Sequence, residues 1–329
     1  MRLSIPDAAE SASYPRAEAD RDRWILERRA PRNTIDVSRA VTAFVEEELT
    51  EKGEVVPVAT VFLANRECPW RCLMCDLWKN TTEESVPRGA IPAQIREALA
   101  SLPPALRIKL YNSGSFFDPR AVPPEDYGEI ASLVAGFDRV IVESHPALVG
   151  ETCARFGNLL RGDFEIAMGL ETIHPEVLAK LNKRMTVEGF RRAARRLEAI
   201  GIALRVFVLL GLPFLSREES LEWARRSLDV AFDSGATAAS IVPTRSGNGA
   251  LDALQDAGDF ESPTLEGLEA ALAYGVALGR GRVFADLWDV ERLRACAACF
   301  PGRVERLRQI NRSQALPPPL ACGACEVKT

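Results

Sequence analysis

The chain has 329 residues with a net charge of -5 and a pI near 5.4, and 47% of its residues are hydrophobic. This composition supplies a large core and excludes a disordered chain, and the acidic balance gives no overall electrostatic surface for tight non-specific nucleic-acid binding. Because no run of about 18 apolar residues occurs and the first residues lack the apolar segment of a signal peptide, we expect no membrane insertion and a cytoplasmic location.

The first part of the chain offers few periodic signals. Residues 1–32 are rich in Ala, Asp, Glu and Arg without steady periodicity, and we expect a loosely ordered lead-in. In residues 36–53 the apolar side chains recur at helical spacing, which predicts a helix on the edge of the core that ends at Gly53. Residues 54–65 then form a β-rich run that leads into a cysteine-rich turn.

Strands and helices alternate regularly after this turn. The pattern predicts strands at 106–112, 139–144, 164–171, 202–211 and 236–243, and helices at 91–102, 123–137, 146–160, 188–201 and 216–235. Helices of this length between short strands require parallel pairing with right-handed crossovers. Counting the strand at 54–65, we predict a six-strand α/β partial or full barrel with its function at the carboxyl ends of the strands; a doubly wound open sheet is the alternative.

The last part of the chain differs in composition. A helix at 265–279 and a short strand at 282–288 precede two cysteine pairs, which are separated by an arginine-rich helix and a run of three prolines. We therefore divide the chain into an extension with a helix (1–54), a barrel (55–289) and a small C-terminal four-cysteine metal module (290–329).

Three cysteines, Cys68, Cys72 and Cys75, lie in the turn after the first barrel strand with the spacing CxxxCxxC. Seven of the eight cysteines occur in such close groups, which is typical of metal ligands in a reducing compartment. An iron–sulfur cluster usually takes four cysteines, so three without a nearby fourth would leave one iron open. From the triplet alone, a zinc loop or surface cysteines are the alternatives.

The triplet, the SGSFFD turn, the GLET segment with its following NKR, the GLPF stretch and the RSGNG loop together resemble the radical S-adenosylmethionine (SAM) superfamily. These motifs are similar to those in the branch that contains the Elongator catalytic subunit and the methylthiotransferases. The SGSFFD and GLPF motifs are most similar to those of the archaeosine-forming radical enzymes. The resemblance implies a 4Fe-4S cluster on the three cysteines, with S-adenosylmethionine bound to its open iron. It also implies cleavage of that cofactor to a 5′-deoxyadenosyl radical by an electron from a donor such as flavodoxin or ferredoxin. Met74 departs from the aromatic residue usual before the last cysteine.

Residues at the strand ends could surround this cofactor. Gly114 would let the backbone approach a ligand closely, and Glu143 and Glu171 end two successive strands. In the family a Gly-Gly-Glu stretch holds the cofactor's amino group and a basic residue contacts its carboxylate; a Ser-Gly-Ser turn and Lys183 fall at the matching places. The cofactor contacts implied by the resemblance are Ser113, Gly114, Ser115, Glu143, Glu171, Lys183, Gly211 and Leu212. Plain turns, solvent-facing carboxylates and a surface lysine are the alternatives.

Beyond the sixth strand, the loop VPTRSGNGAL carries Arg245 and Asn248 at the mouth of the predicted barrel. These side chains could bind a carboxylate or phosphate of the substrate, and a glycine-rich surface loop is the alternative.

The C-terminal pairs Cys296/Cys299 and Cys322/Cys325 each have the spacing CxxC and are separated by twenty-two residues. Two such pairs suit a tetrahedral four-cysteine site, and we expect structural zinc in preference to an auxiliary iron–sulfur cluster.

The leading hypothesis for function is a radical SAM enzyme that abstracts hydrogen from a substrate, and by family analogy a tRNA base. Radical modification of a small molecule, peptide or lipid precursor with an auxiliary cluster is one alternative. A non-catalytic iron–sulfur or zinc carrier or assembly protein is the other.

Overall fold

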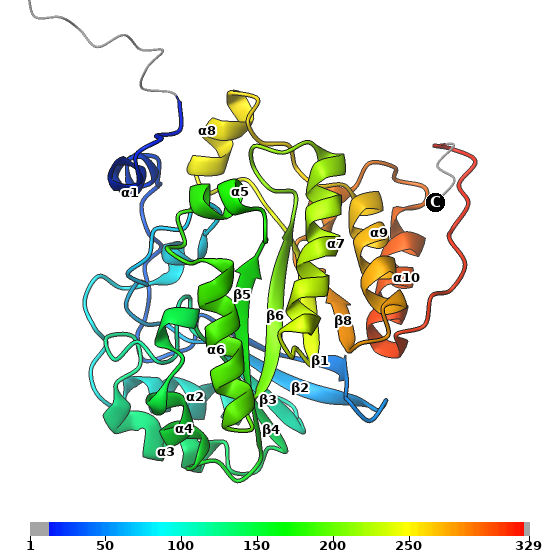
Figure 1. The fold of residues 1–329 in the computed structure, drawn as a ribbon. Helices are drawn as coiled ribbons and strands as arrows, with labels where there is room; N and C mark the ends of the chain where they lie inside the picture. The colour runs from blue at the N-terminus through cyan, green and yellow to red at the C-terminus, as the bar shows by residue number, and fades with distance from the viewer. Residues whose placement is uncertain (1–12, 326–329) are drawn as a thin grey trace, which may run out of the picture.

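The computed structural model describes residues 13–325, and one eight-stranded sheet organises them (Figure 1). The strands follow one another in sequence order, and every pair from β2 onward is parallel. Their bounds are β1 (Thr42–Leu49), β2 (Val55–Phe62), β3 (Arg107–Tyr111), β4 (Arg139–Glu143), β5 (Asp163–Glu171), β6 (Ala203–Leu210), β7 (Ala238–Pro243) and β8 (Arg282–Ala285). Because the order never reverses, the sheet is a partial barrel and not a doubly wound sheet, as predicted. The strand expected at 282–288 is β8, which extends the parallel series beyond the six strands counted from the sequence.

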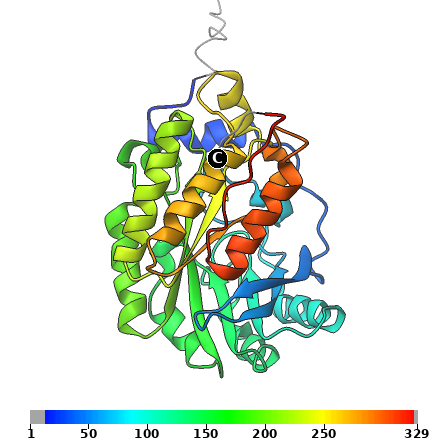
Figure 2. The same cartoon turned by 90° about the vertical axis from the view of Figure 1, so that its right-hand side faces the viewer.

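Helices connect the parallel strands and cover the outer face of the sheet (Figures 1 and 2). Their bounds are α2 (Ala90–Ser101), α3 (Tyr127–Leu133), α4 (Glu151–Gly157), α5 (Pro175–Lys180), α6 (Val187–Ala199), α7 (Arg217–Asp233), α8 (Ala250–Asp256), α9 (Leu265–Ala277) and α10 (Phe300–Ser313). The longest of these helices, α7, begins with a capping box formed by Ser216 and Glu219. Among residues 13–325, no helix is both long and apolar enough to cross a bilayer.

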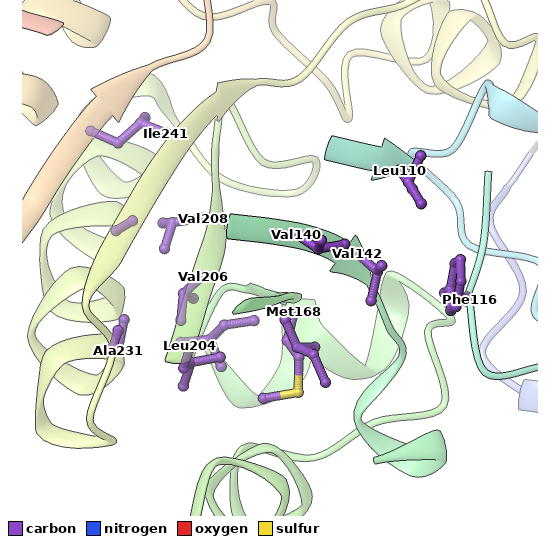
Figure 3. Packing of buried hydrophobic residues seen from close by; sticks show 14 of the residues in the cluster. Leu110, Phe116, Val140, Val142, Met168, Leu204, Val206, Val208, Ala231 and Ile241 are labelled. Atoms are coloured by element: carbon purple, nitrogen blue, oxygen red, sulfur yellow. The ribbon is translucent and has the colours of Figure 1, made fainter. Parts of the chain in front are cut away.

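The main core lies between the sheet and these helices. Side chains at alternate strand positions, such as Val140, Val142, Met168 and Val206, point outward and are almost fully buried (Figure 3). The residues between them therefore point into the barrel, because neighbouring strand residues face opposite sides of a sheet.

Residues 42–49 form an antiparallel edge strand, so the helix predicted at 36–53 is wrong. A turn closed by Gly53, whose φ is +80°, reverses the chain between β1 and β2. Glu46 and Glu48 of β1 reach cations of other strands inside the barrel. Residues two apart on a strand face the same side, so both carboxylates contribute to the ion network inside the barrel, Glu48 buried and Glu46 partly exposed.

The expectation of a loosely ordered lead-in is also wrong for residues 18–26, which form α1 (Glu18–Leu26). Trp24 and Ile25 are buried in a small cluster with Leu73 of the cysteine turn and with apolar residues of α8. Arg21 donates to the carbonyl of Ala179 at 2.7 Å. Helix α1 therefore packs against the cysteine turn and is held there by these contacts.

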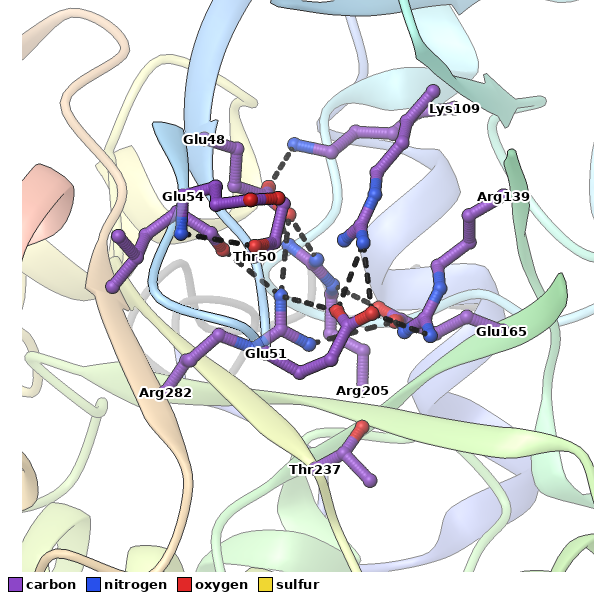
Figure 4. A network of polar contacts seen from close by, with 12 residues as sticks. Glu48, Thr50, Glu51, Glu54, Lys109, Arg139, Glu165, Arg205, Thr237 and Arg282 are labelled. Atoms are coloured by element: carbon purple, nitrogen blue, oxygen red, sulfur yellow. Dashed lines mark hydrogen bonds and ion pairs between the residues drawn. The ribbon is translucent and has the colours of Figure 1, made fainter. Parts of the chain in front are cut away.

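A network of buried charges fills the amino-terminal end of the barrel (Figure 4). The guanidinium of Arg205 contacts Glu48 through both terminal nitrogens and Glu165 through Nε at 2.6 Å. Glu165 also accepts from Arg139 at 2.9 Å, and Lys109 pairs with Glu48 at 2.6 Å. In this barrel, ion pairs take the place of the apolar side chains that usually pack the interior, and they close the amino-terminal end.

Side-chain amides of α10 satisfy the free edge of β8. Asn311 donates to and accepts from the backbone of Ala285, with both distances 2.9 Å. Gln314 does the same for Val283 at 2.6 and 2.8 Å. This pairing attaches the segment between the two C-terminal cysteine pairs to the edge of the barrel.

Candidate active site at the strand ends

The cysteine turn lies at the carboxyl ends of the strands and is held by backbone contacts from distant segments. The N–H of Leu73 donates to the carbonyl of Leu181 at 2.9 Å. The amide of Asn182 donates to the Arg71 carbonyl at 2.8 Å, and that of Asn248 donates to the carbonyls of Leu73 and Cys75 at 2.8 and 3.2 Å. The turn is thus fixed before any ligand binds.

The three cysteines of the turn suit a cluster better than a single ion. Within the described residues, the cysteines close enough together to share one ion are the four of the C-terminal pairs, and not Cys68, Cys72 and Cys75. A cubane presents each of its irons to a different cysteine, so wider spacing is expected. Burial raises the pKa of Cys68 to about 11 and that of Cys75 to about 12, and it also raises the pKa of Cys72. The protein alone therefore does not stabilise three thiolates, and a cationic cluster would.

The turn after β3 approaches the cysteines closely. A Cβ on Gly114 would lie 3.1 Å from the Cβ of Cys68, so the position favours glycine. Glu143, at the end of β4, accepts from the backbone N–H groups of Asn112 at 2.5 Å and Gly114 at 3.3 Å, while burial raises its pKa. Ser113 has a φ of 53°, and Ser115 shares a hydrogen bond of 3.1 Å with Ser144. The structure brings the predicted Ser-Gly-Ser turn and Glu143 together beside Cys68.

At the end of β5, Glu171 and Lys183 form a buried ion pair, and Lys183 also donates to the Gly169 carbonyl at 2.7 Å. The sheet register shifts between Gly169 and Glu171, and Glu171 has a φ of 63°. Beside this pair, the ring of His145 stacks on Trp70 of the cysteine turn with 3.7 Å between centroids. Burial lowers the pKa of His145 to about 4, so this ring is neutral near pH 7. The structure thus brings Glu171 and Lys183 together at the strand ends, where they pair with each other.

At the end of β6, backbone groups and not side chains are available to contact a ligand. Gly211 has a φ of +82°, and a Cβ there would lie 2.5 Å from Cδ of Pro263. The side chain of Leu212 is buried with Val177 and Leu181, and its N–H donates to Ser220 at 3.0 Å. Leu212 therefore does not present an open apolar wall to a ligand, and any contact here would come from the backbone.

The two residues of the predicted substrate loop have different roles. Asn248 is buried, holds the cysteine turn as described, and accepts from the N–H of Leu251 at 2.7 Å. Arg245 binds Asp286 at 2.7 Å and the carbonyl of Trp288 at 2.6 Å. Asn248 thus binds the backbone of the cysteine turn, and Arg245 stabilises the loop that carries Trp288.

The sequence reasoning missed two polar side chains at strand ends. Asn112 directly follows β3 and is fully buried, yet neither atom of its amide has a hydrogen-bond partner. The hydroxyl of Thr244, directly after β7, is also buried without a partner. Such orphaned groups are rare in folded proteins and fit a polar ligand at this end of the barrel. Their position at a strand end was the available signal.

We predict that Asn112→Ala weakens S-adenosylmethionine binding about tenfold without destabilising the ligand-free protein, because the amide bonds to nothing in the chain. Calorimetric titration and thermal unfolding would measure the two effects. Asn33→Ala, which removes an exposed contact with Asn80, is the control and should change neither affinity nor folding appreciably. A loss of stability with unchanged affinity would make Asn112 a structural residue.

Five aromatic rings, which we call the aromatic floor, contact one another inside and at the mouth of the barrel: Phe44, Phe62, Tyr111, Phe207 and Trp288. Strands β3 and β6 are not neighbours, so the 6.2 Å contact between Tyr111 and Phe207 crosses the barrel interior. Trp288 is 53% exposed and the other four rings are partly exposed. Because the five rings lie together and each is partly exposed, the floor offers planar apolar surface on which a flat ligand could stack.

The four C-terminal cysteines meet as predicted. Their sulfur atoms all lie within 4.8 Å of one another, and those of Cys299 and Cys325 are 3.8 Å apart. The backbone N–H groups of Cys299 and Ala298 lower the pKa of Cys296 to about 7, and that of Ala324 lowers the pKa of Cys322. The chain therefore holds a four-cysteine metal site just before and after α10.

The structure defines a partial barrel of parallel strands with a three-cysteine turn at the carboxyl ends of its strands, and similar chains are found among known proteins. No protein-family model matches the sequence. The chain is similar to archaeosine synthase subunit beta of Methanosarcina acetivorans, with 28% identity over 225 residues. The protein of the same name from Thermococcus kodakarensis is 28% identical over 166 residues, which are 48% of this chain and 51% of that one.

Among solved structures, methylornithine synthase has the same fold, with a TM-score of 0.55 and 14% identity over 95% of this chain and 78% of its own. This likeness concerns the fold alone. The match to the Methanosarcina protein covers 65% of this chain and 65% of the relative, just under two thirds of either.

Proposed function

We propose that the chain is a radical SAM enzyme that modifies a nucleobase, with a tRNA base as its substrate. The aromatic floor carries this proposal, because planar heterocycles stack on exposed rings and a base turned out of its helix is bound in this way. The similarity to archaeosine synthase subunit beta supports the same substrate class.

The proposed cofactor site consists of Cys68, Cys72 and Cys75 for a 4Fe-4S cluster and of the strand-end groups for S-adenosylmethionine. When bound, and with one electron from an external carrier, the cluster and S-adenosylmethionine would yield methionine and a 5′-deoxyadenosyl radical able to abstract hydrogen from an unreactive carbon. The protein's own part is to orient the cofactor through Glu143, the Ser-Gly-Ser turn and the Glu171–Lys183 pair, and to hold the base on the aromatic floor. Such cysteine chemistry suits a reducing cytoplasm.

Bulk tRNA nucleosides from strains with and without the gene would test the substrate. We expect one modified nucleoside to disappear, or its precursor to accumulate, in the strain without the gene. The strain should be complemented by the wild type but not by Phe207→Ala, which opens the floor. Identical nucleoside profiles would contradict the tRNA assignment and direct attention to small planar molecules.

We further propose that the four C-terminal cysteines bind one zinc ion, which holds the segment from residue 290 to Cys325 as a small module. Four thiolates at about 2.3 Å from one ion stand about 3.8 Å apart in a tetrahedron, which agrees with the Cys299–Cys325 separation. Thiolates on a cubane stand further apart, because each binds a different iron.

Metal analysis of a Cys68/Cys72/Cys75 triple-alanine variant tests the zinc assignment. We expect one zinc per chain and no iron, and loss of zinc when Cys296 and Cys299 are also replaced. Iron retained by the triple variant would instead establish an auxiliary cluster.

A further inference from the structure

A basic groove of about 400 Å³ lies on the flank of the cysteine turn, outside the site described above. Its lining includes four arginines and two glutamates: Arg32, Arg66, Arg71, Arg120, Glu67 and Glu83. Pro69, which directly follows Cys68, also lines it, and Arg71 donates to the Cys68 carbonyl at 2.5 Å. The groove is therefore one residue from a proposed cluster ligand.

The buried carboxylate of Glu67 holds two of the four groove arginines, Arg32 and Arg71, in place. Glu67 accepts from Arg29 at 2.6 Å, from Arg71 at 3.1 Å and from Arg32. Nε of Arg29 and one terminal nitrogen of Arg32 still lack an acceptor.

Among the described residues, none pairs with the side chain of Arg66, which is partly exposed. Arg120 pairs with Asp118 at 3.3 Å. With four arginines and two glutamates in its lining, the groove keeps an excess of positive charge on a chain whose net charge is -5.

We infer that this groove docks an acidic one-electron carrier, a flavin or iron–sulfur protein, beside the cluster. The inference rests on the proposed function, because it assumes a cluster on Cys68. The reduced carrier gives up one electron and the cluster takes it up, and no bond forms or breaks. Redox encounters use small interfaces and depend on complementary charge, which matches a compact groove. An RNA backbone would require a longer basic stripe.

The position of the groove leaves the substrate side open. The segment that follows β2 lies on the opposite side of the molecule from β8 and α10 in Figure 1. Trp288, the most exposed ring of the aromatic floor, lies three residues beyond the end of β8. A carrier in the groove and a substrate on the floor can therefore bind together.

The test compares the reconstituted full chain with Arg66→Glu and with a matched reversal, Arg195→Glu, on the exposed face of α6. Binding of an acidic flavodoxin, measured by fluorescence titration at low and at high salt, is the first readout. We expect Arg66→Glu to weaken binding roughly tenfold at low salt and to flatten the salt dependence, and Arg195→Glu to do neither.

The rate of cluster reduction, followed by visible absorbance, is the second readout. The flavodoxin hydroquinone should reduce the Arg66→Glu protein more slowly, whereas dithionite, which needs no docking, should reduce all three proteins equally. Equal flavodoxin binding by all three proteins would overturn the inference. Weaker tRNA binding by Arg66→Glu with unchanged flavodoxin binding would also overturn it and assign the groove to RNA. A chain that assembles no cluster would contradict the proposed function, while the binding readout would still test the groove.

Discussion

Replacing Cys72 with alanine is expected to remove the iron of the cysteine turn and to reduce 5′-deoxyadenosine formation to background. Two remaining thiolates cannot hold a cluster that already leaves one iron without a cysteine. The fold should survive, because the turn is also held by hydrogen bonds from Asn182 and Asn248. Iron content, visible absorbance and product release after anaerobic reconstitution would be measured together.

Cys153→Ala is the matched control for this variant. Cys153 lies on α4, fully buried in the main core and away from both cysteine groups. We expect a loss of about 1 kcal/mol in unfolding free energy and unchanged iron content. A Cys72→Ala protein that keeps its iron and its product would contradict the assignment of the three ligands.

Arg205→Met is expected to cost about 3–5 kcal/mol of unfolding free energy, because it leaves Glu48 and Glu165 buried with fewer cations. Chemical denaturation would measure the loss. Arg226→Met is the control: it breaks an exposed i,i+4 pair with Glu222 and should cost no more than about 0.5 kcal/mol. Equal effects of the two substitutions would show that the network adds no stability beyond that of surface pairs.

The same network predicts how stability depends on pH. Burial alone would raise the pKa values of Glu48 and Glu165, but Arg205 and the other cations lower both below the usual range. Carboxyl groups with lowered folded pKa values contribute stability above their unfolded pKa, about 4.3, and lose it as the pH falls further. We expect a nearly constant unfolding free energy from about pH 7 to 5 and a steep fall below about pH 4. Urea titrations across this range would show it, and a loss beginning near pH 6 would point to other groups.

The sequence was sufficient for the parts of the molecule that depend on spacing along the chain. The CxxxCxxC turn, the alternation of strand and helix and the two CxxC pairs each express a local or periodic pattern, so the partial barrel and the four-cysteine site could be predicted. The parts that depend on contacts across the barrel could not. Glu46 and Glu48 look like a solvated face until Lys109 and Arg205 are seen opposite them.

The candidate site shows the same division. A turn next to a strand end predicted that the Ser-Gly-Ser segment would lie near Cys68. It did not reveal that the side-chain amide of Asn248 donates a hydrogen bond to the backbone of the cysteine turn, or that the side-chain amide of Asn112 has no hydrogen-bond partner. The aromatic floor also could not be predicted, because its rings come from four different strands and the segment after β8 and meet only in the folded barrel.

The most direct test of the account is the release of 5′-deoxyadenosine by the anaerobically reconstituted chain with dithionite and S-adenosylmethionine, before and after addition of tRNA lacking the modification. We expect slow release from the protein alone, a marked increase with the tRNA, and none from Cys72→Ala. A chain that assembles its cluster and releases no 5′-deoxyadenosine under either condition would contradict it.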